Sequence, residues 1–228
     1  MKNKQHCPGL LILYVEFKLK NKVLNHLFLL SWILILVTRF ALGNPVIRDH
    51  QIDSLRIITT KGAYISSCRP DFCNPVGKGD FFFLGKMREG NYPSCNDKFL
   101  IYWDLEQIPK HAQILKAVMR LYCLQMKGDV NGKLQYEKIT ENWESLVTYS
   151  TQPQSDTVEG LFSRWPRADR WFDVDITPFV KDWLNGKIEN NGLIGSVSKG
   201  TKNATAIFAS PNYSNSIFRP QLIIYYKK

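Results

Sequence analysis

The positions of apolar and polar residues predict a chain built mainly from β-strands. In residues 98–105, Phe99, Ile101 and Trp103 fall on one side, and from Leu115 to Cys123 apolar side chains alternate with others. A period of two is that of a strand with one face in the core. The remaining expected strands are residues 55–60, 63–66, 80–87, 133–139, 146–149, 171–175, 193–197, 205–210 and 220–226. Roughly ten strands with turns at this spacing are typical of an all-β sandwich.

The strongest local signals predict a strand, a capped helix and a second strand in succession. Residues 171–175 alternate between large apolar and acidic side chains, as a half-buried strand does. Thr177 offers a side-chain oxygen for a helix cap, Pro178 fits the first helical position, and Gly186 is placed to end the helix in a left-handed conformation. The pattern therefore predicts one short helix at about residues 178–185.

One long segment, residues 151–169, is polar and has no regular pattern. We expect it to form an irregular loop. Loops of this length are usually functional or mobile, which makes this segment the first place to look for a site.

The N-terminal residues 1–43 have the features of a secretory signal peptide. Basic residues precede an apolar run of 11 residues, 27–37, and the small residues Ala41 and Gly43 precede a cleavage point before Asn44. A signal anchor is the alternative, although the stretch of about 15 residues from Val23 to Val37 is short for a membrane span. We expect cleavage and a secreted, extracellular protein with no stable membrane span.

After cleavage, residues 44–54 would form a linker and residues 55–228 a single domain. The whole chain has a formal net charge of +10, but residues 44–228 hold 24 Lys or Arg and 19 Asp or Glu. This modest basic excess suits an anionic partner such as an acidic polysaccharide, and it is also ordinary for a soluble protein.

The cysteines predict at least one disulfide bond. Cys68, Cys73, Cys95 and Cys123 follow the expected cleavage point, and an even number of cysteines in an oxidising compartment favours pairing. Three pairings are open. We favour a local bridge between Cys68 and Cys73, while Cys123 lies at a core position of its strand and is expected to be a buried thiol.

Two sequons, at Asn203 and Asn212, are candidate glycosylation sites in a secreted protein. A zinc site is not expected, because His50 and His111 lie far from the cysteines in the sequence. We expect no cofactor. A structural calcium ion is left open, and the sequence marks no ligands for a metal.

Several fragments occur in an order that resembles a known family. They are residues 99–105, 108–109, 121–122, 143–144, 147–149, 175–177, 191–193, 208–210 and 219–222. Together they are similar to the motifs of DNRLRE-domain proteins, also classed as carbohydrate-binding module family 96. The resemblance implies a jelly-roll β-sandwich and non-catalytic carbohydrate binding, with alginate-type ligands attributed to some members. A more distant similarity is to growth-factor propeptide domains.

A candidate sugar site lies in residues 164–171, which lead into the expected strand at residues 171–175. Its predicted ligand-binding residues are Arg164, Trp165, Arg167, Arg170 and Trp171, with Tyr149 as a weaker addition. Indole rings can cover the apolar face of a pyranose, and arginines can bind its carboxylates. In the alternative interpretation the tryptophans fold back into the core, and the arginines pair with Asp156, Glu159 or Asp169.

The residues do not suggest an enzyme or a nucleic-acid-binding protein. No nucleophile motif or Ser-His-Asp arrangement occurs, and no nucleic-acid-binding motif is found. We therefore expect a secreted, non-catalytic module that binds polysaccharide, with an anionic polymer as its partner. The alternative is a structural or protein-interaction β-sandwich of an extracellular matrix or cell surface that binds no sugar.

Overall fold

The computed structural model describes residues 51–59, 61–73, 79–87, 94–128, 130, 132–144 and 146–228. These residues fall within a compact unit, His50–Lys228. The predicted signal peptide and residues 44–50 of the predicted linker lie outside the described residues. No helix in the described part of the chain is long and apolar enough to cross a membrane.

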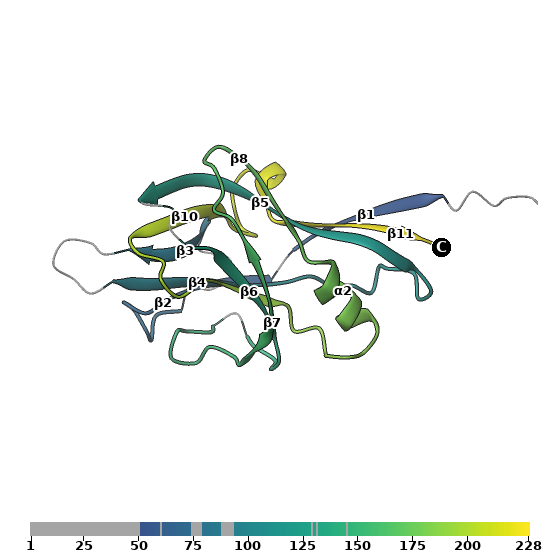
Figure 1. The fold of residues 1–228 in the computed structure, drawn as a ribbon, viewed down its shortest axis with the longest axis horizontal. Coiled ribbons are helices and arrows are strands. Elements are labelled where there is room, and N and C mark those ends of the chain that lie inside the picture. The colour runs from purple at the N-terminus through teal and green to yellow at the C-terminus, as the bar shows by residue number, and fades with distance from the viewer. Residues whose placement is uncertain are drawn as a thin grey trace, which may run out of the picture. The chain divides into compact units, whose positions relative to one another are not determined.

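The described residues form an all-β fold with one short α-helix, as the sequence predicts (Figure 1). In chain order, the elements are β1 (Ile52–Ile58), β2 (Lys61–Ser66), β3 (Phe81–Met87), β4 (Cys95–Tyr102), β5 (Gln113–Gly128), β6 (Leu134–Ile139), β7 (Ser155–Ser163), β8 (Arg170–Asp175), α2 (Thr177–Leu184), β9 (Leu193–Val197), β10 (Ala204–Ala209), the 3₁₀ turn η1 (Ser216–Phe218) and β11 (Gln221–Lys227).

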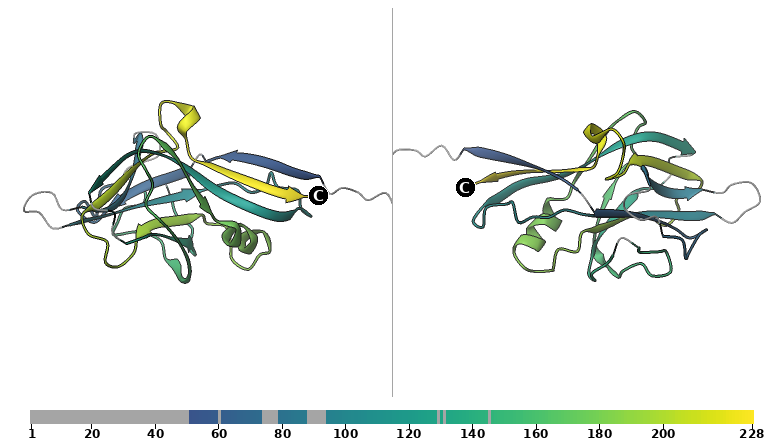
Figure 2. Two further views of the ribbon diagram at one scale, coloured as in Figure 1. Left: turned by 45° about the horizontal axis from the view of Figure 1, so that its top comes forward. Right: turned by 180° about the vertical axis from the view of Figure 1, so that it is seen from behind.

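The strands form one continuous, antiparallel sheet of 11 strands, which curls so that two layers enclose a core (Figure 2). Its hydrogen-bonded order is β1-β11-β5-β10-β3-β4-β9-β6-β7, with β2 added beside β4 and β8 beside β5. This arrangement is consistent with an all-β sandwich. The helix α2 lies close to the first residues of β5 (Figure 1).

Strand β5 is the centre of one layer because it pairs with β8, β10 and β11. Ala117, Met119 and Cys123 are fully buried on its inner face, which confirms the predicted alternation and the buried Cys123 thiol. Leu115 is instead 37% exposed. The register with β11 passes from Lys116 directly to Ile114, and this bulge turns Leu115 outward, contrary to the predicted pattern.

The buried residues of the described segments form two apolar clusters. The main one lies between the layers and contains Phe99, Ile101 and Trp103, the side of β4 expected to face one way. The second lies on the other face of β4, where Leu100 packs with Trp143. Strand β4 is therefore buried on both faces.

Several predictions about the strands are wrong. Strand β1 begins at Ile52, inside the expected linker, and residues 146–149 form no strand. Strand β7 occupies Ser155–Ser163, within the expected loop. Among the described strands, β7 pairs with β6 alone. Val158 is 91% exposed, and the residues of β7 lack the alternation that marks a half-buried strand.

The ends of α2 agree with the sequence except at the cap. Gly186 has a φ of +68° after the helix, as predicted. The Thr177 side chain makes no capping bond. Its hydroxyl donates to Asp175 at 2.6 Å and accepts from the Ala117 amide at 2.8 Å, so Thr177 ties the start of the helix to β5 instead.

The disulfide bond joins Cys68 to Cys95, so the predicted bridge between Cys68 and Cys73 is wrong. Cys73 is a free thiol. The register of β2 with β4 explains the difference, because Ser66 pairs with Asp97 and two more residues along each strand bring Cys68 opposite Cys95. That neighbour is 27 residues away in the sequence and could not be identified without the pairing of the strands.

Candidate functional site

The fold places the two tryptophans of the predicted sugar-binding segment in different environments. Trp165 packs against the main core cluster, and its indole nitrogen is buried with no hydrogen-bond partner among the described residues. The next residue, Pro166, is buried as well. Trp165 is therefore oriented as the alternative interpretation expected, toward the core rather than toward a ligand.

Trp171 belongs to a different environment, on the outer side of β8. Its ring meets Tyr122 of β5 edge-on at 5.5 Å and lies 6.3 Å from Phe218 of η1, while Tyr122 and Phe218 stack at 4.0 Å. All three rings are partly exposed. We call Tyr122, Trp171 and Phe218 the aromatic surface; η1 lies close to β5 and β8 in Figure 1.

An ion pair holds a cation beside this surface. The Arg120 guanidinium lies 5.3 Å from the Trp171 ring and donates two hydrogen bonds to Asp173, at 2.8 and 3.1 Å. The hydrogen bond to Asp173 raises the pKa of Arg120. Because Asp173 already neutralises it, Arg120 supports the Trp171 ring and is not the main candidate for binding an anion.

The other cations come from the connection between β7 and β8. Arg164, Arg167 and Arg170 are exposed, and no ion pair joins any of them to a carboxylate in the described part of the chain. Two of the acids expected as their partners in the alternative interpretation, Asp156 and Glu159, instead contact Lys138. The three arginines therefore leave positive charge available next to Trp171 in the sequence.

Tyr149 lies apart from this surface. It packs against the second core cluster, its hydroxyl accepts a hydrogen bond from Asn96 at 3.2 Å, and Lys98 lies 5.3 Å from its ring. Trp171 instead contacts residues of β5 and η1. The structure thus does not bring Tyr149 together with the aromatic surface.

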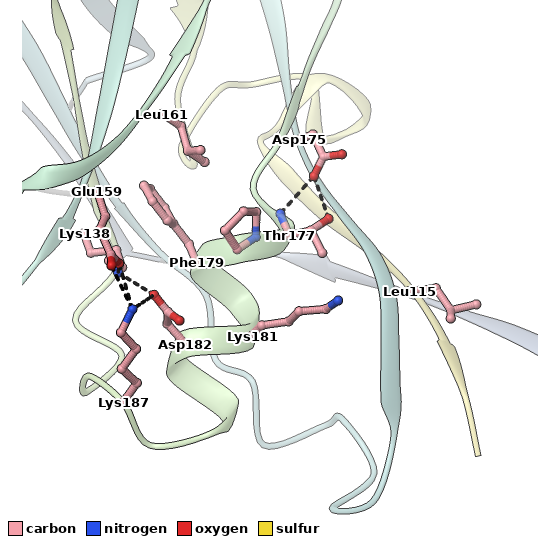
Figure 3. A pocket seen from close by; sticks show the side chains of 11 residues that line it. Leu115, Lys138, Glu159, Leu161, Asp175, Thr177, Phe179, Lys181, Asp182 and Lys187 are labelled. Atoms are coloured by element: carbon pink, nitrogen blue, oxygen red, sulfur yellow. Dashed lines mark hydrogen bonds and ion pairs between the residues drawn. The ribbon is translucent and has the colours of Figure 1, made fainter.

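A pocket of about 810 Å³ lies beside α2, and its charges are already balanced within the protein (Figure 3). Lys138 and Lys187 converge there on Glu159 and Asp182, at distances from 2.5 to 3.5 Å. The hydrogen bonds to Asp182 and Glu159 raise the pKa of Lys138, although burial opposes them. We therefore interpret this pocket as a structural link between α2, β6 and β7.

Sequence reasoning missed Tyr122 and Phe218. Tyr122 could have been found, because it is an outward position of the strand next to that of Trp171. Phe218 could not have been found, because only the tertiary fold brings η1 next to Tyr122. As for metals, no group of three or more His, Cys, Asp or Glu side chains able to hold an ion occurs among the described residues.

A curled, all-β domain with a partly exposed aromatic surface, and with exposed arginines in the segment that leads to Trp171, has the form of a binding module. The chain belongs to carbohydrate-binding module family 96, whose model matches residues 86–226. This confirms the resemblance in the sequence motifs and shows that the protein is a carbohydrate-binding module, of a family whose members act without catalysis. A search of curated proteins found no match.

Proposed function

We propose that this module binds an acidic polysaccharide outside the cell, without catalysing a reaction on it, and that the aromatic surface and Arg164, Arg167 and Arg170 form the binding site. The observation that carries the proposal is the set of three exposed arginines, without ion-pair partners among the described residues, in the segment that leads to the partly exposed Trp171. Trp165 is left out of the site because it faces the core.

The chemistry of such a polymer fits both parts of the site. The apolar face of a pyranose ring can pack on Trp171, while its carboxylates accept charge-assisted hydrogen bonds from guanidinium groups. Arginine is well suited to this because its planar group can bind both oxygens of a carboxylate. A neutral glucan would satisfy only the aromatic part.

Two features support an extracellular location. The bond between Cys68 and Cys95 is of the kind that persists in oxidising compartments. Asn203, in the first of the two sequons, is exposed at the surface, where glycosylation at Asn203 and Asn212 would accompany secretion. Together with the signal-peptide features of residues 1–43, these observations favour a secreted protein.

Affinity electrophoresis of the purified full-length protein tests the proposal. Native gels would contain alginate, pectate, heparin or a neutral glucan, and a gel without polymer would correct for the charge of each variant. We expect one of the acidic polymers to retard the protein, and added salt to weaken the effect. The triple variant Trp171→Ala, Arg167→Gln, Arg170→Gln should lose the retardation, whereas Lys110→Gln, Lys133→Gln, which removes two exposed lysines elsewhere, should keep it.

Free migration in every gel would overturn the acidic-polysaccharide proposal. It would favour the alternative of a structural or protein-interaction module. Retardation by the neutral glucan alone would also overturn it, because the arginines would then have no role in choosing the ligand.

A further inference from the structure

Besides the pocket next to α2, the structure has another concave region. It shares no residue with the aromatic surface. It is a groove of about 630 Å³, within the range of about 300–1,000 Å³ typical of small-molecule sites. Its lining comes from β2, β3, β4, β5 and β10 and from the turn after β2. Its lining includes Tyr64, Arg69, Phe83, Asp97, Lys127 and Thr205. We call it the β2–β10 groove.

One residue that lines the groove, Thr205, has a buried hydroxyl without a hydrogen-bond partner in the described part of the chain. Thr205 pairs with Gly85 in the ladder between β10 and β3, and an added Cβ at Gly85 would lie 2.5 Å from the Thr205 Oγ1. The Thr205 side chain therefore leans over the glycine. Thr205 is only 4% exposed, and its Oγ1 has no hydrogen-bond partner among the described residues. Burying a hydroxyl in this way is unfavourable unless a ligand or water completes the bond.

Two aromatic rings form the wall of the groove. The rings of Tyr64 and Phe83 are 5.0 Å apart, and both are partly exposed. The Tyr64 hydroxyl donates to Asp97 at 3.0 Å, which holds the ring in place. Burial and the neighbouring Asp97 carboxylate raise the pKa of Tyr64, so it stays neutral. An uncharged, fixed ring of this kind can pack against the apolar face of a sugar.

The groove also carries positive charge. Arg69 lines it from the turn after β2 and Lys127 from β5. Both are exposed, and neither has an ion pair with a carboxylate in the described segments. The bond between Cys68 and Cys95 joins the turn that carries Arg69 to the start of β4. The rim therefore places two cations around a rigid aromatic wall.

We infer that the β2–β10 groove is a second saccharide site, which takes one uronate unit or a chain end of the polymer. The sugar ring packs on Tyr64 and Phe83, a ring hydroxyl completes the hydrogen bonding of Thr205, and the carboxylate pairs with Arg69 and Lys127. The class of ligand rests on the proposed function. The site itself rests on the groove, its rings and the unpartnered Thr205.

The test uses short acidic saccharides that are too small to bridge the two regions. Saturated trisaccharides prepared from alginate and from pectate would be titrated into the full-length protein by calorimetry. We expect Thr205→Val and Lys127→Gln each to weaken binding of the preferred trisaccharide at least tenfold. Lys110→Gln, an exposed lysine in the turn before β5, is the matched control and should bind as the wild type does. Thermal unfolding would verify that each variant is folded, and Lys127→Gln changes only an exposed side chain.

Retardation of the same variants in polymer gels separates the two proposals. If the wild type binds polymer but not the trisaccharides, or if both groove variants bind the trisaccharides as the wild type does, the groove is not a saccharide site and the proposed function stands. If polymer and trisaccharides both fail to bind the wild type, the proposed function fails, and the groove proposal fails with it.

Discussion

The Nζ atom of Lys138 lies 2.5 Å from Asp182 and 2.8 Å from Glu159, and the Lys138 side chain is only 2% exposed. One buried cation therefore joins β6, β7 and α2 (Figure 3). Asp156 lies 3.7 Å away and adds a third carboxylate. Without the lysine, these acids would face one another in a partly buried space.

Lys138→Met should consequently destabilise the fold strongly. We expect the free energy of unfolding to fall by about 3 kcal/mol, the lower end of the range for breaking a buried pair, because Glu159 is half exposed. Lys187→Met is the matched control. Its lysine is 57% exposed, so solvent screens its ion pairs and its loss should destabilise the fold much less. Urea denaturation measures both values, and equal losses in the two variants would contradict the structural role of Lys138.

The same cluster predicts a dependence of stability on acid. Hydrogen bonds from Lys138 and Lys187 lower the pKa of Glu159 from 4.5 to about 2 in the folded protein. Because the folded pKa is the lower one, this stabilisation is present above pH 4.5 and is lost as the pH falls toward 2. Glu159→Gln should make the urea midpoint less sensitive to pH in that window.

Glu106→Gln, in the exposed turn after β4, provides the control for this measurement. It should retain the pH dependence of the wild type. The prediction is contradicted if Glu159→Gln loses stability between pH 4.5 and 2 as steeply as the wild type does.

The disulfide bond gives a prediction that distinguishes the observed pairing of Cys68 with Cys95 from a pairing of Cys68 with Cys73. Replacing Cys68 and Cys95 with alanine should lower the free energy of unfolding by about 3 kcal/mol, the value expected for a closed loop of this size. Cys73→Ala should have little effect, since Cys73 is a free thiol. Denaturation under non-reducing conditions, with peptide mapping of the bridge, tests this. A bridged peptide that contains Cys73 would contradict the structure.

The two tryptophans of the predicted site should behave in opposite ways. Trp165→Ala removes a ring packed on the core, so we expect a loss of about 2–3 kcal/mol in stability and unchanged retardation by the polymer. Trp171→Ala should cost about 1 kcal/mol, because the ring is partly exposed, and should weaken the retardation. Urea denaturation and affinity electrophoresis, applied to both variants, measure the two effects. Loss of retardation in Trp165→Ala alone would contradict this assignment.

Much of the fold could be predicted because its signals are local. The alternation of Ala117, Met119 and Cys123 identifies a half-buried strand without knowledge of its partners, and Gly186 ends α2 where the sequence places it. Strand β7 could not be predicted, because its sequence carries no such local signal. Its pairing with a single neighbour leaves most of its side chains near solvent, and the sequence then carries no periodic pattern.

The candidate site could be predicted only in part. The sequence places aromatic rings and arginines together in residues 164–171, but it does not say which ring faces the solvent. That depends on how the connection between β7 and β8 crosses the end of the core, which turns Trp165 inward and leaves Trp171 beside Tyr122. The β2–β10 groove has no sequence signal, since its residues come from segments far apart in the chain.

By itself, then, the sequence determined the all-β class, the single helix, the buried face of β5 and the family motifs. Each of these follows from side chains within a few residues of one another. The tertiary structure alone decided the partner of Cys68, the bulge at Leu115 and the grouping of Tyr122, Trp171 and Phe218. The physical reason is that these features depend on the register between distant strands. A shift of one residue in that register would reverse which side chains face the core.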